Sequence, residues 1–149
     1  MELTWIYKNF NELTTSELYA ILQLRSEVFV VEQNCVYQDI DGKDKKSFHL
    51  MALDGFELVA YTRLVAPEVS FTEASIGRVI TSPRYRGLGI GIALVEKSIT
   101  HILETYSTNT IRIGAQLYLK KFYTSFGFVA QGDEFLEDGI PHVEMILEK

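Results

Sequence analysis

The chain has 149 residues, a length that predicts one domain spanning residues 1–149. Its formal net charge of −6 at pH 7 argues against general nucleic-acid binding, which needs a basic face. Cys35 is the only cysteine, so no internal disulfide can form and a cytoplasmic location is expected. The N-terminus lacks the pattern of a signal peptide, and no apolar run approaches the roughly 20 residues of a membrane span, so we expect no membrane association.

The first third of the chain predicts a strand, a long helix and a loop. Residues 3–7 are rich in strand-forming side chains. Thr14 and Glu17 form a capping-box pattern, and apolar residues at helical spacing follow it, so a helix is predicted over residues 15–31. A polar loop with a turn at Asp41–Gly42 comes next.

The middle of the chain predicts three strands and a second helix. Residues 48–54 and 56–66 flank Asp54–Gly55, which is typical of a tight hairpin, and residues 75–81 form the third strand. A glycine-rich stretch then leads into a helix that ends near Tyr106. The inner face of this helix is predicted to carry Ile92, Val95, Ile99, Ile102 and Leu103.

The last third predicts a strand over residues 110–115 and a short helix over 116–126 that Gly127 ends. Two further strands are predicted over residues 128–133 and 142–149, around a turn at Asp138–Gly139. The strands cluster before the central helix and do not alternate strictly with helices. This order favours a mixed α+β sheet over a doubly wound parallel one.

The sequence "RYRGLGIG" before the second helix predicts an anion-binding site. Gly87, Gly89 and Gly91 let the backbone curl closely around a ligand, although a glycine inside a helix costs about 0.8–1 kcal/mol relative to alanine. The helix start offers unpaired N–H groups, and Arg84 and Arg86 add charge-assisted donors. The alternative is that the glycines only make a tight turn between strand and helix. Three alternating glycines with two arginines favour binding of a pyrophosphate over that alternative.

Two common nucleotide-binding patterns do not fit this stretch. A Walker loop requires Gly-Lys-Ser/Thr, which is missing here. A dinucleotide-binding loop has the spacing G-x-G-x-x-G and an acidic residue at the end of the next strand. The spacing here is G-x-G-x-G, and the next strand ends in "GAQ".

The sequence "RYRGLG" resembles the R/Q-x-x-G-x-G/A signature of the GNAT acetyltransferases, in which it also lies between a strand and a long helix. "GRVITSPRYRGLGIGIALVEK" is similar to that family's acetyl-CoA strand, loop and helix, and "AQLYLKKFYTSFGF" to its terminal helix segment. "FVVEQNCVYQDIDGKD" and "EDGIPHVEM" are similar to segments of the ElaA-like branch. The chain is therefore identified as a member of the GNAT superfamily, ElaA-like branch.

The resemblance implies a central, mostly antiparallel, twisted sheet of six or seven strands with about four helices, splayed between its fourth and fifth strands. Acetyl-CoA would lie in that splay as the co-substrate. Main-chain groups of one strand would pair with the pantetheine arm, with the Val79 N–H as the oxyanion donor. The implied cofactor-binding residues are Val79, Ile80, Thr81, Arg84, Arg86, Gly87, Leu88, Gly89, Ile90 and Gly91.

Tyr123 aligns with the tyrosine that many family members use as the general acid, which would protonate the leaving thiolate of CoA. Leu119, Phe122, Tyr123 and Phe126 also fall at helical spacing, so packing in the core is the alternative role for Tyr123. Tyr118 on the same helix is a weaker candidate.

A cationic amine must lose a proton before it attacks, and a carboxylate or histidine can accept that proton. The candidates are Glu32, Asp39, His49 and His142. We prefer Glu32 and His142, each as a base or an acceptor contact, against a surface role for Glu32 and a structural role for His142. Asp41, Asp44 and Asp138 are assigned to turns.

Arg78 shares strand parity with apolar residues, so it is expected either to extend its charged end to the surface or to reach the cleft.

The resemblance implies an N-acetyltransferase that moves an acetyl group from acetyl-CoA to a primary amine by direct attack in a ternary complex. No metal is expected. The alternative is a non-catalytic acyl-CoA-binding sensor or scaffold. A homodimer is a candidate assembly, and the acceptor amine is not specified by any residue pattern.

Overall fold

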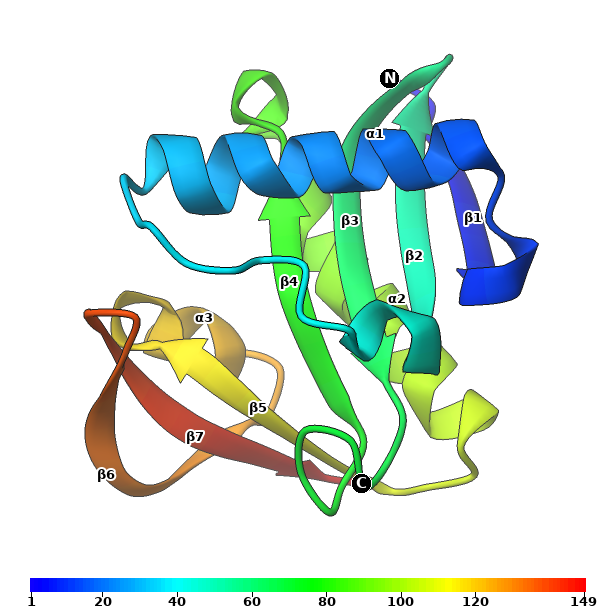
Figure 1. Cartoon of the computed structure of the whole chain (residues 1–149). Coiled ribbons are helices and arrows are strands. Elements are labelled where there is room, and N and C mark those ends of the chain that lie inside the picture. The colour runs from blue at the N-terminus through cyan, green and yellow to red at the C-terminus, as the bar shows by residue number, and fades with distance from the viewer.

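The computed structural model describes residues Met1–Lys149, which form seven strands in two antiparallel sheets (Figure 1). The first sheet has the order β1-β2-β3-β4 and the second has the order β5-β7-β6. The strands span Thr4–Asn9 (β1), Ser47–Asp54 (β2), Glu57–Val65 (β3), Ser75–Thr81 (β4), Thr110–Gln116 (β5), Val129–Glu137 (β6) and Ile140–Glu148 (β7). All seven strands were predicted from the sequence, six of them to within two residues at each end, whereas β6, predicted over residues 128–133, extends four residues further to Glu137.

Three α-helices accompany the sheets, one fewer than the four that were expected. They are α1 (Thr15–Arg25), α2 (Ile90–Thr105) and α3 (Lys120–Thr124). The helix α1 continues directly into a π-helical segment, η2, at Ser26–Glu32. The short 3₁₀ turns are η1 (Phe10–Glu12), η3 (Lys43–Lys46), η4 (Pro83–Tyr85) and η5 (Leu117–Leu119).

The predicted capping box of α1 is confirmed. The Glu17 N–H donates to Thr14 Oγ1 over 3.1 Å, and the Thr14 N–H donates to Glu17 Oε1 over 2.8 Å. The helix predicted over residues 15–31 ends one residue later, but its last seven residues have π-helical hydrogen bonding. The helix predicted over 116–126 is shorter, because its first turn is 3₁₀, and Gly127 (φ +103°) then redirects the chain.

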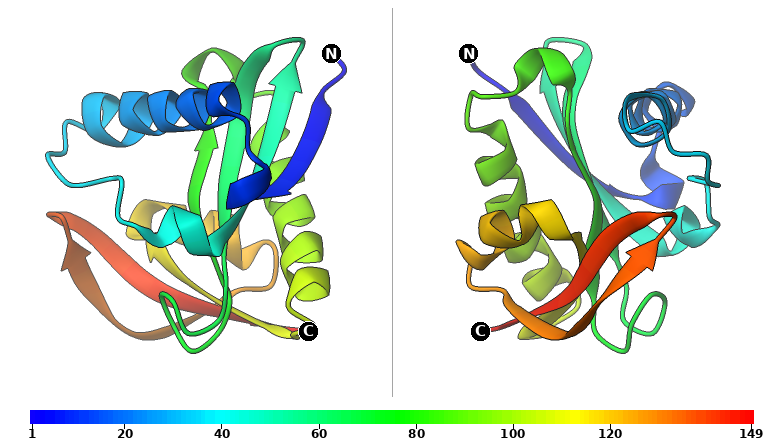
Figure 2. Two further views of the ribbon diagram at one scale, coloured as in Figure 1. Left: turned by 45° about the vertical axis from the view of Figure 1, so that its right-hand side comes forward. Right: turned by 90° about the vertical axis from the view of Figure 1, so that its left-hand side faces the viewer.

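The two long helices lie on opposite faces of the first sheet (Figure 2). The face under α2 carries the larger apolar cluster, and the face under α1 carries a smaller one that includes Ile21, Met51 and Ile80. The prediction that Ile92 faces the core is wrong, because its side chain is 51% exposed. Burial of α2 begins instead at Ile90 and recurs every three or four residues, which puts Ile92 on the outer side of the helix.

The two sheets meet at one end only. Ala74 forms an isolated parallel bridge with Ile111, and the Arg112 N–H donates to the Ala74 carbonyl oxygen over 3.0 Å. Beyond this bridge β4 and β5 diverge (Figure 1). The predicted splay between the fourth and fifth strands is therefore confirmed.

A buried ionic cluster ties the loop after η2 to the first sheet. The Arg25 side chain is fully buried, and it donates to the carboxylates of Asp39 and Asp44 over 2.9 and 2.6 Å. Arg63 donates to Asp41 over 2.8 and 3.0 Å and to Asp44 over 3.1 Å. Asp41 has the predicted turn role, since its Oδ1 accepts from the Lys43 N–H over 3.0 Å. The turn assignment was incomplete, however, because the carboxylates of Asp41 and Asp44 also neutralise buried arginines.

Candidate active site

A cleft of about 990 Å³ opens where β4 and β5 diverge. Its walls come from η2 and the loop that follows, from β4 and β5, from the start of α2, from α3 and from the β6–β7 turn. The predicted site residues that line it are Glu32, Val79, Ile80, Thr81, Arg86, Gly91, Tyr123 and His142. The predicted residues Arg84, Gly87, Leu88, Gly89 and Ile90 do not line it.

The start of α2 has the geometry of an anion site. Gly89 is the N-cap residue with φ +78°, and Gly87 has φ +80°, a left-handed conformation that favours glycine at both positions. The first N–H groups of a helix have no intrahelical partner, and here no side chain caps them. The helix start therefore keeps donors for an anionic group, while Ile90 itself is buried in the core.

Gly91 differs from the two glycines before it. Its φ is not positive, and a Cβ built there would lie 3.6 Å from Thr81 Oγ1 and 3.9 Å from Phe122, which are ordinary contacts. The fold would therefore accept a side chain at this position. Because Gly91 lines the cleft, the space that it leaves open fits a ligand that approaches the helix closely.

The two arginines of the loop have different surroundings. Arg84 pairs with Glu57, and its side chain is 72% exposed. Arg86 reaches across the mouth of the cleft, where its two terminal nitrogens donate to Glu32 over 2.7 and 2.9 Å. These hydrogen bonds from Arg86 lower the pKa of Glu32. The sequence assigned Arg86 to the pyrophosphate and Glu32 to the acceptor, and in the structure they bind each other.

Tyr123 is buried and belongs to the large apolar cluster, yet it also lines the cleft. Its ring packs edge-on against Phe122 and Phe128. Burial raises the pKa of Tyr123, and Tyr118 raises it further, so the phenol keeps its proton at neutral pH. Tyr123 therefore packs in the core and also lines the cleft, and its role as general acid stays a prediction.

The β6–β7 turn brings His142 into the cleft. Its Nδ1 lies 2.7 Å from the Ile140 carbonyl oxygen, so Nδ1 is the protonated nitrogen that donates this bond. Its Nε2 lies 3.4 Å from a carboxylate oxygen of Glu137. Nε2 is thus the nitrogen available for proton transfer, with a carboxylate beside it.

Two of the four candidate bases lie away from the cleft. His49 is fully buried, with its ring nitrogens 2.6 Å from the Tyr61 hydroxyl and 2.9 Å from the Asp44 carbonyl oxygen, and burial lowers its pKa. Asp39 is buried against Arg25 and Arg78. Both are structural residues.

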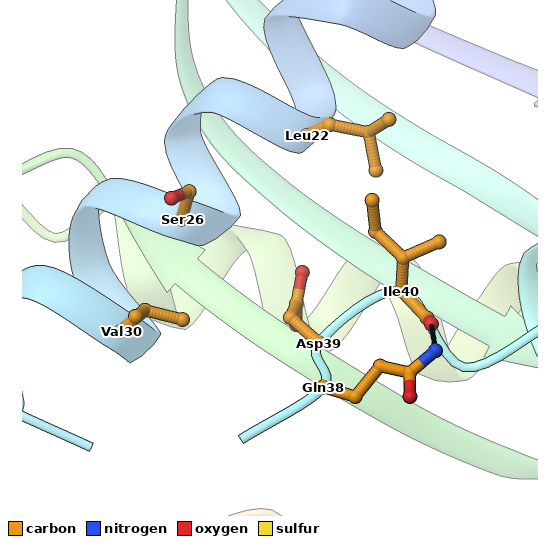
Figure 3. Close-up of a pocket in the computed structure, with 6 residues that line it drawn as sticks. All are labelled: Leu22, Ser26, Val30, Gln38, Asp39 and Ile40. Atoms are coloured by element: carbon orange, nitrogen blue, oxygen red, sulfur yellow. Dashed lines mark hydrogen bonds between the residues drawn. The ribbon is translucent and has the colours of Figure 1, made fainter. Parts of the chain in front are cut away.

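Asp39 borders a second, smaller hollow of about 470 Å³ between the α1–η2 helix and the loop that carries Gln38 and Ile40 (Figure 3). Leu22, Ser26 and Val30 form its helix side. The only charged group of this hollow, the Asp39 carboxylate, already has two arginine partners. This hollow therefore offers no unpaired charged group to a ligand.

The sequence did not single out several polar groups of the cleft. Glu137 lies beside His142, and Gln33 donates to the side chain of Gln116 across the cleft over 3.4 Å. Asp138 was assigned to a turn, where its φ is +51°, but it also lines the cleft. No local motif marks these residues, because only the fold brings their separate segments together.

No group of three or more His, Cys, Asp or Glu side chains is arranged to hold a metal ion. None of the helices combines the length and apolar character needed to cross a membrane.

Comparison with known proteins places these features in a family. Residues 12–149 match the model of the acetyltransferase (GNAT) domain. The chain is 42% identical to protein ElaA of Escherichia coli over 148 residues, which are 98% of this chain and 97% of that protein. The crystal structure of an acyl-CoA N-acyltransferase from Pseudomonas aeruginosa superposes with a TM-score of 0.93 at 42% identity, covering 98% of this chain and 99% of that one. The crystal structure of E. coli ElaA gives a TM-score of 0.92 at 41% identity and covers 99% of this chain and all of that one.

Proposed function

Because the chain belongs to the GNAT acetyltransferase family, we propose that it transfers an acetyl group from acetyl-CoA to a primary amine. The whole chain would act as one cytoplasmic catalytic domain. The observation that carries this proposal is the single cleft that brings together the middle of β4, the start of α2 and the buried Tyr123. The description of the P. aeruginosa relative as an acyl-CoA N-acyltransferase supports it.

The proposed cofactor contacts follow from the two walls of the cleft. The pyrophosphate of acetyl-CoA would accept hydrogen bonds from the N–H groups at the start of α2 and from Arg86, since a helix start favours an anion. The pantetheine arm would pair with main-chain groups of Val79, Ile80 and Thr81. This arrangement would bring the thioester between β4 and Tyr123.

In the proposed reaction, the neutral amine attacks the acetyl carbonyl carbon, and the carbonyl oxygen becomes an oxyanion that accepts a hydrogen bond from the Val79 N–H. Collapse of this intermediate breaks the C–S bond. The Tyr123 hydroxyl donates to the leaving thiolate, which supports proton delivery to the sulfur. The atoms balance as amine plus acetyl-CoA giving amide plus CoA, with one further proton released when the amine starts as an ammonium.

The proton acceptor for the ammonium would come from the acceptor side of the cleft. His142 Nε2 is the best candidate, because Nδ1 is bound to the Ile140 carbonyl and Glu137 can stabilise the imidazolium. Glu32 is the second candidate, once Arg86 turns to the pyrophosphate.

Release of CoA in the presence of a panel of primary amines tests the proposal. Tyr123→Phe is expected to lower kcat by about 10²-fold or more, in the range of general acid catalysis, while the affinity for acetyl-CoA stays within about twofold. An unchanged kcat would remove Tyr123 from the mechanism. Binding of acetyl-CoA without turnover of any amine would favour the alternative of a non-catalytic sensor or scaffold.

A further inference from the structure

Arg78 has an unusual backbone conformation in the middle of β4. Its φ is +51°, in the left-handed region that side chains other than glycine rarely adopt. The β3–β4 register slips at the same place, because Tyr61 pairs with Ile80 whereas Arg63 pairs with Gly77. Arg78 and Val79 thus stand opposite the single residue Thr62, which is a β-bulge.

The side chain of Arg78 is bound on several sides. Its Nε donates to the Asp39 carboxylate over 2.8 Å, and one terminal nitrogen donates to the Asp39 carbonyl oxygen over 3.0 Å and to Asp41 over 3.3 Å. The guanidinium also lies 5.7 Å from the centre of the Tyr37 ring. All three partners come from the loop after η2, which crosses in front of β4 (Figure 1).

The partners of Arg78 are themselves held in place. Asp39 is 8% exposed, and its other carboxylate oxygen accepts from the buried Arg25 over 2.9 Å. Asp41 is bound by both terminal nitrogens of Arg63. Arg78 is therefore attached to a buried ionic cluster and not to a mobile surface charge, so these contacts can offset the strain of its backbone.

We infer that Arg78 is a positioning residue, whose bonds to Asp39 and Asp41 hold the β4 bulge so that the following N–H, that of Val79, faces the acetyl carbonyl oxygen. The inference rests on the proposed function, which assigns the Val79 N–H to the oxyanion. Strain in a strand is retained where the surroundings enforce it. Here the strained residue and one of its two aspartate partners, Asp41, line the cleft. A donor that is misdirected by even about 1 Å loses much of its effect on the transition state.

Three substitutions of Arg78 separate the parts of this inference. Arg78→Ala removes the bonds and leaves a strained residue. Arg78→Gly also removes the bonds, but glycine adopts the left-handed conformation without strain, so this variant should keep the fold. Arg78→Lys keeps the charge without the planar fork of donors. We expect kcat to fall by at least about tenfold in Arg78→Ala and Arg78→Gly, and by an intermediate factor in Arg78→Lys.

A spectroscopic readout distinguishes misdirection of the donor from a general loss of structure. Infrared spectra of bound acetyl-CoA, labelled with carbon-13 at the carbonyl, report the hydrogen bond to the carbonyl oxygen without any amine. In the wild-type protein the carbonyl band is expected at a lower wavenumber than for acetyl-CoA in water, because the hydrogen bond weakens the C=O bond. In Arg78→Gly the wavenumber of the band should return toward its value in water. The affinity for CoA, which has no acetyl group, should stay within about twofold because the helix-start contacts are intact.

Arg112→Ala is the matched control. Like Arg78, Arg112 binds two carboxylates, those of Glu73 and Glu144, and its side chain is similarly exposed, at 23% against 20% for Arg78. Unlike Arg78, it lies on β5, has no positive φ and does not line the cleft. Its substitution should leave the carbonyl band unchanged. If Arg78→Gly kept both the carbonyl band position and the kcat of the wild type, the positioning role would be overturned. If instead the carbonyl band of acetyl-CoA bound to the wild-type protein lay at its position in water, the assignment of the Val79 N–H, on which the inference rests, would be contradicted.

Discussion

Of the three glycines around the start of α2, Gly91 is the one whose lack of a side chain is not explained by backbone conformation or packing. Gly87 and Gly89 have positive φ, so the backbone itself favours glycine there. Gly91 has room for a methyl group and stands in the first turn of α2, where glycine lowers helix stability. We therefore propose that glycine is needed at this position for a close approach of the ligand.

Substitution of Gly91 should separate stability from binding. Gly91→Ala is expected to raise the free energy of unfolding by up to about 1 kcal/mol, because alanine is the better helix former, and to weaken acetyl-CoA binding by about tenfold or more because the methyl group fills the cleft. Urea denaturation and calorimetric titration measure the two effects. Thr100→Ala, at an exposed site of the same helix, should change stability without changing affinity. Full affinity in Gly91→Ala would contradict a close approach of the pyrophosphate.

The Glu32–Arg86 pair predicts competition between a carboxylate of the protein and the pyrophosphate. Glu32→Gln should tighten acetyl-CoA binding by about two- to fivefold, since an exposed ion pair contributes about 0.2–1 kcal/mol and the substitution releases Arg86. Acetyl-pantetheine, which lacks the pyrophosphate, should bind equally well to both proteins. Glu27→Gln removes an exposed carboxylate that has no hydrogen bond to Arg86 and serves as the control. Equal acetyl-CoA affinities in wild type and Glu32→Gln would rule the competition out.

At the scale of elements, the loop between η2 and β2 is fixed by charge. Its polar composition and its Asp41–Gly42 turn are evident in the sequence, but its partners are not. Arg25, Arg63 and Arg78 come from a helix and two strands, and each contributes to neutralising the aspartates of this loop. The sequence predicted the elements well because their periodicities are local. It missed this cluster because the helix, the two strands and the loop meet only in the fold.

The cluster predicts a specific dependence of stability on pH. Burial alone would raise the pKa of Asp41, but the bonds from Arg63 lower it to about 2 from an ordinary value of 3.8. A carboxylate with a lowered folded-state pKa stabilises the protein above its unfolded-state pKa, and this stabilisation is lost as the pH falls through the folded-state value. The free energy of unfolding of the wild type should therefore decrease as the pH falls from about 4 to about 2.

Asp41→Asn tests this dependence in urea denaturation at several pH values. The variant should be less stable than the wild type at pH 7, and the difference should shrink as the pH approaches 2. Some pH dependence should remain, because burial tends to raise the pKa of Asp44 but its bonds with Arg25 and Arg63 lower it on balance. Asp133→Asn, at an exposed position of β6, is the control and should follow the wild type. A constant difference between Asp41→Asn and wild type at all pH values would show that Asp41 does not titrate in this way.

At the scale of the whole molecule, the candidate active site is the space where the two sheets diverge. One bridge, Ala74–Ile111, joins them at one end, and α2 and α3 flank the open end. The exposed main chain of β4 and the start of α2 face the same opening because the strand, the loop and the helix are consecutive in the chain. The proposed acceptor side is built from η2, the loop after it and the β6–β7 turn, which are far apart in the sequence.

The sequence by itself determined the element order, the α+β class and the loop at the start of α2, because glycine placement, capping and hydrophobic periodicity act over a few residues. It also identified Tyr123, Glu32 and His142, which the fold brings into one cleft. Only the tertiary structure decided that Asp39 and His49 are buried structural residues, that Glu32 binds Arg86, and that Arg78 is fixed in a bulge by Asp39 and Asp41. The physical reason is that a buried charge is neutralised by whichever opposite charge the fold brings near it, and that partner has no fixed distance along the chain.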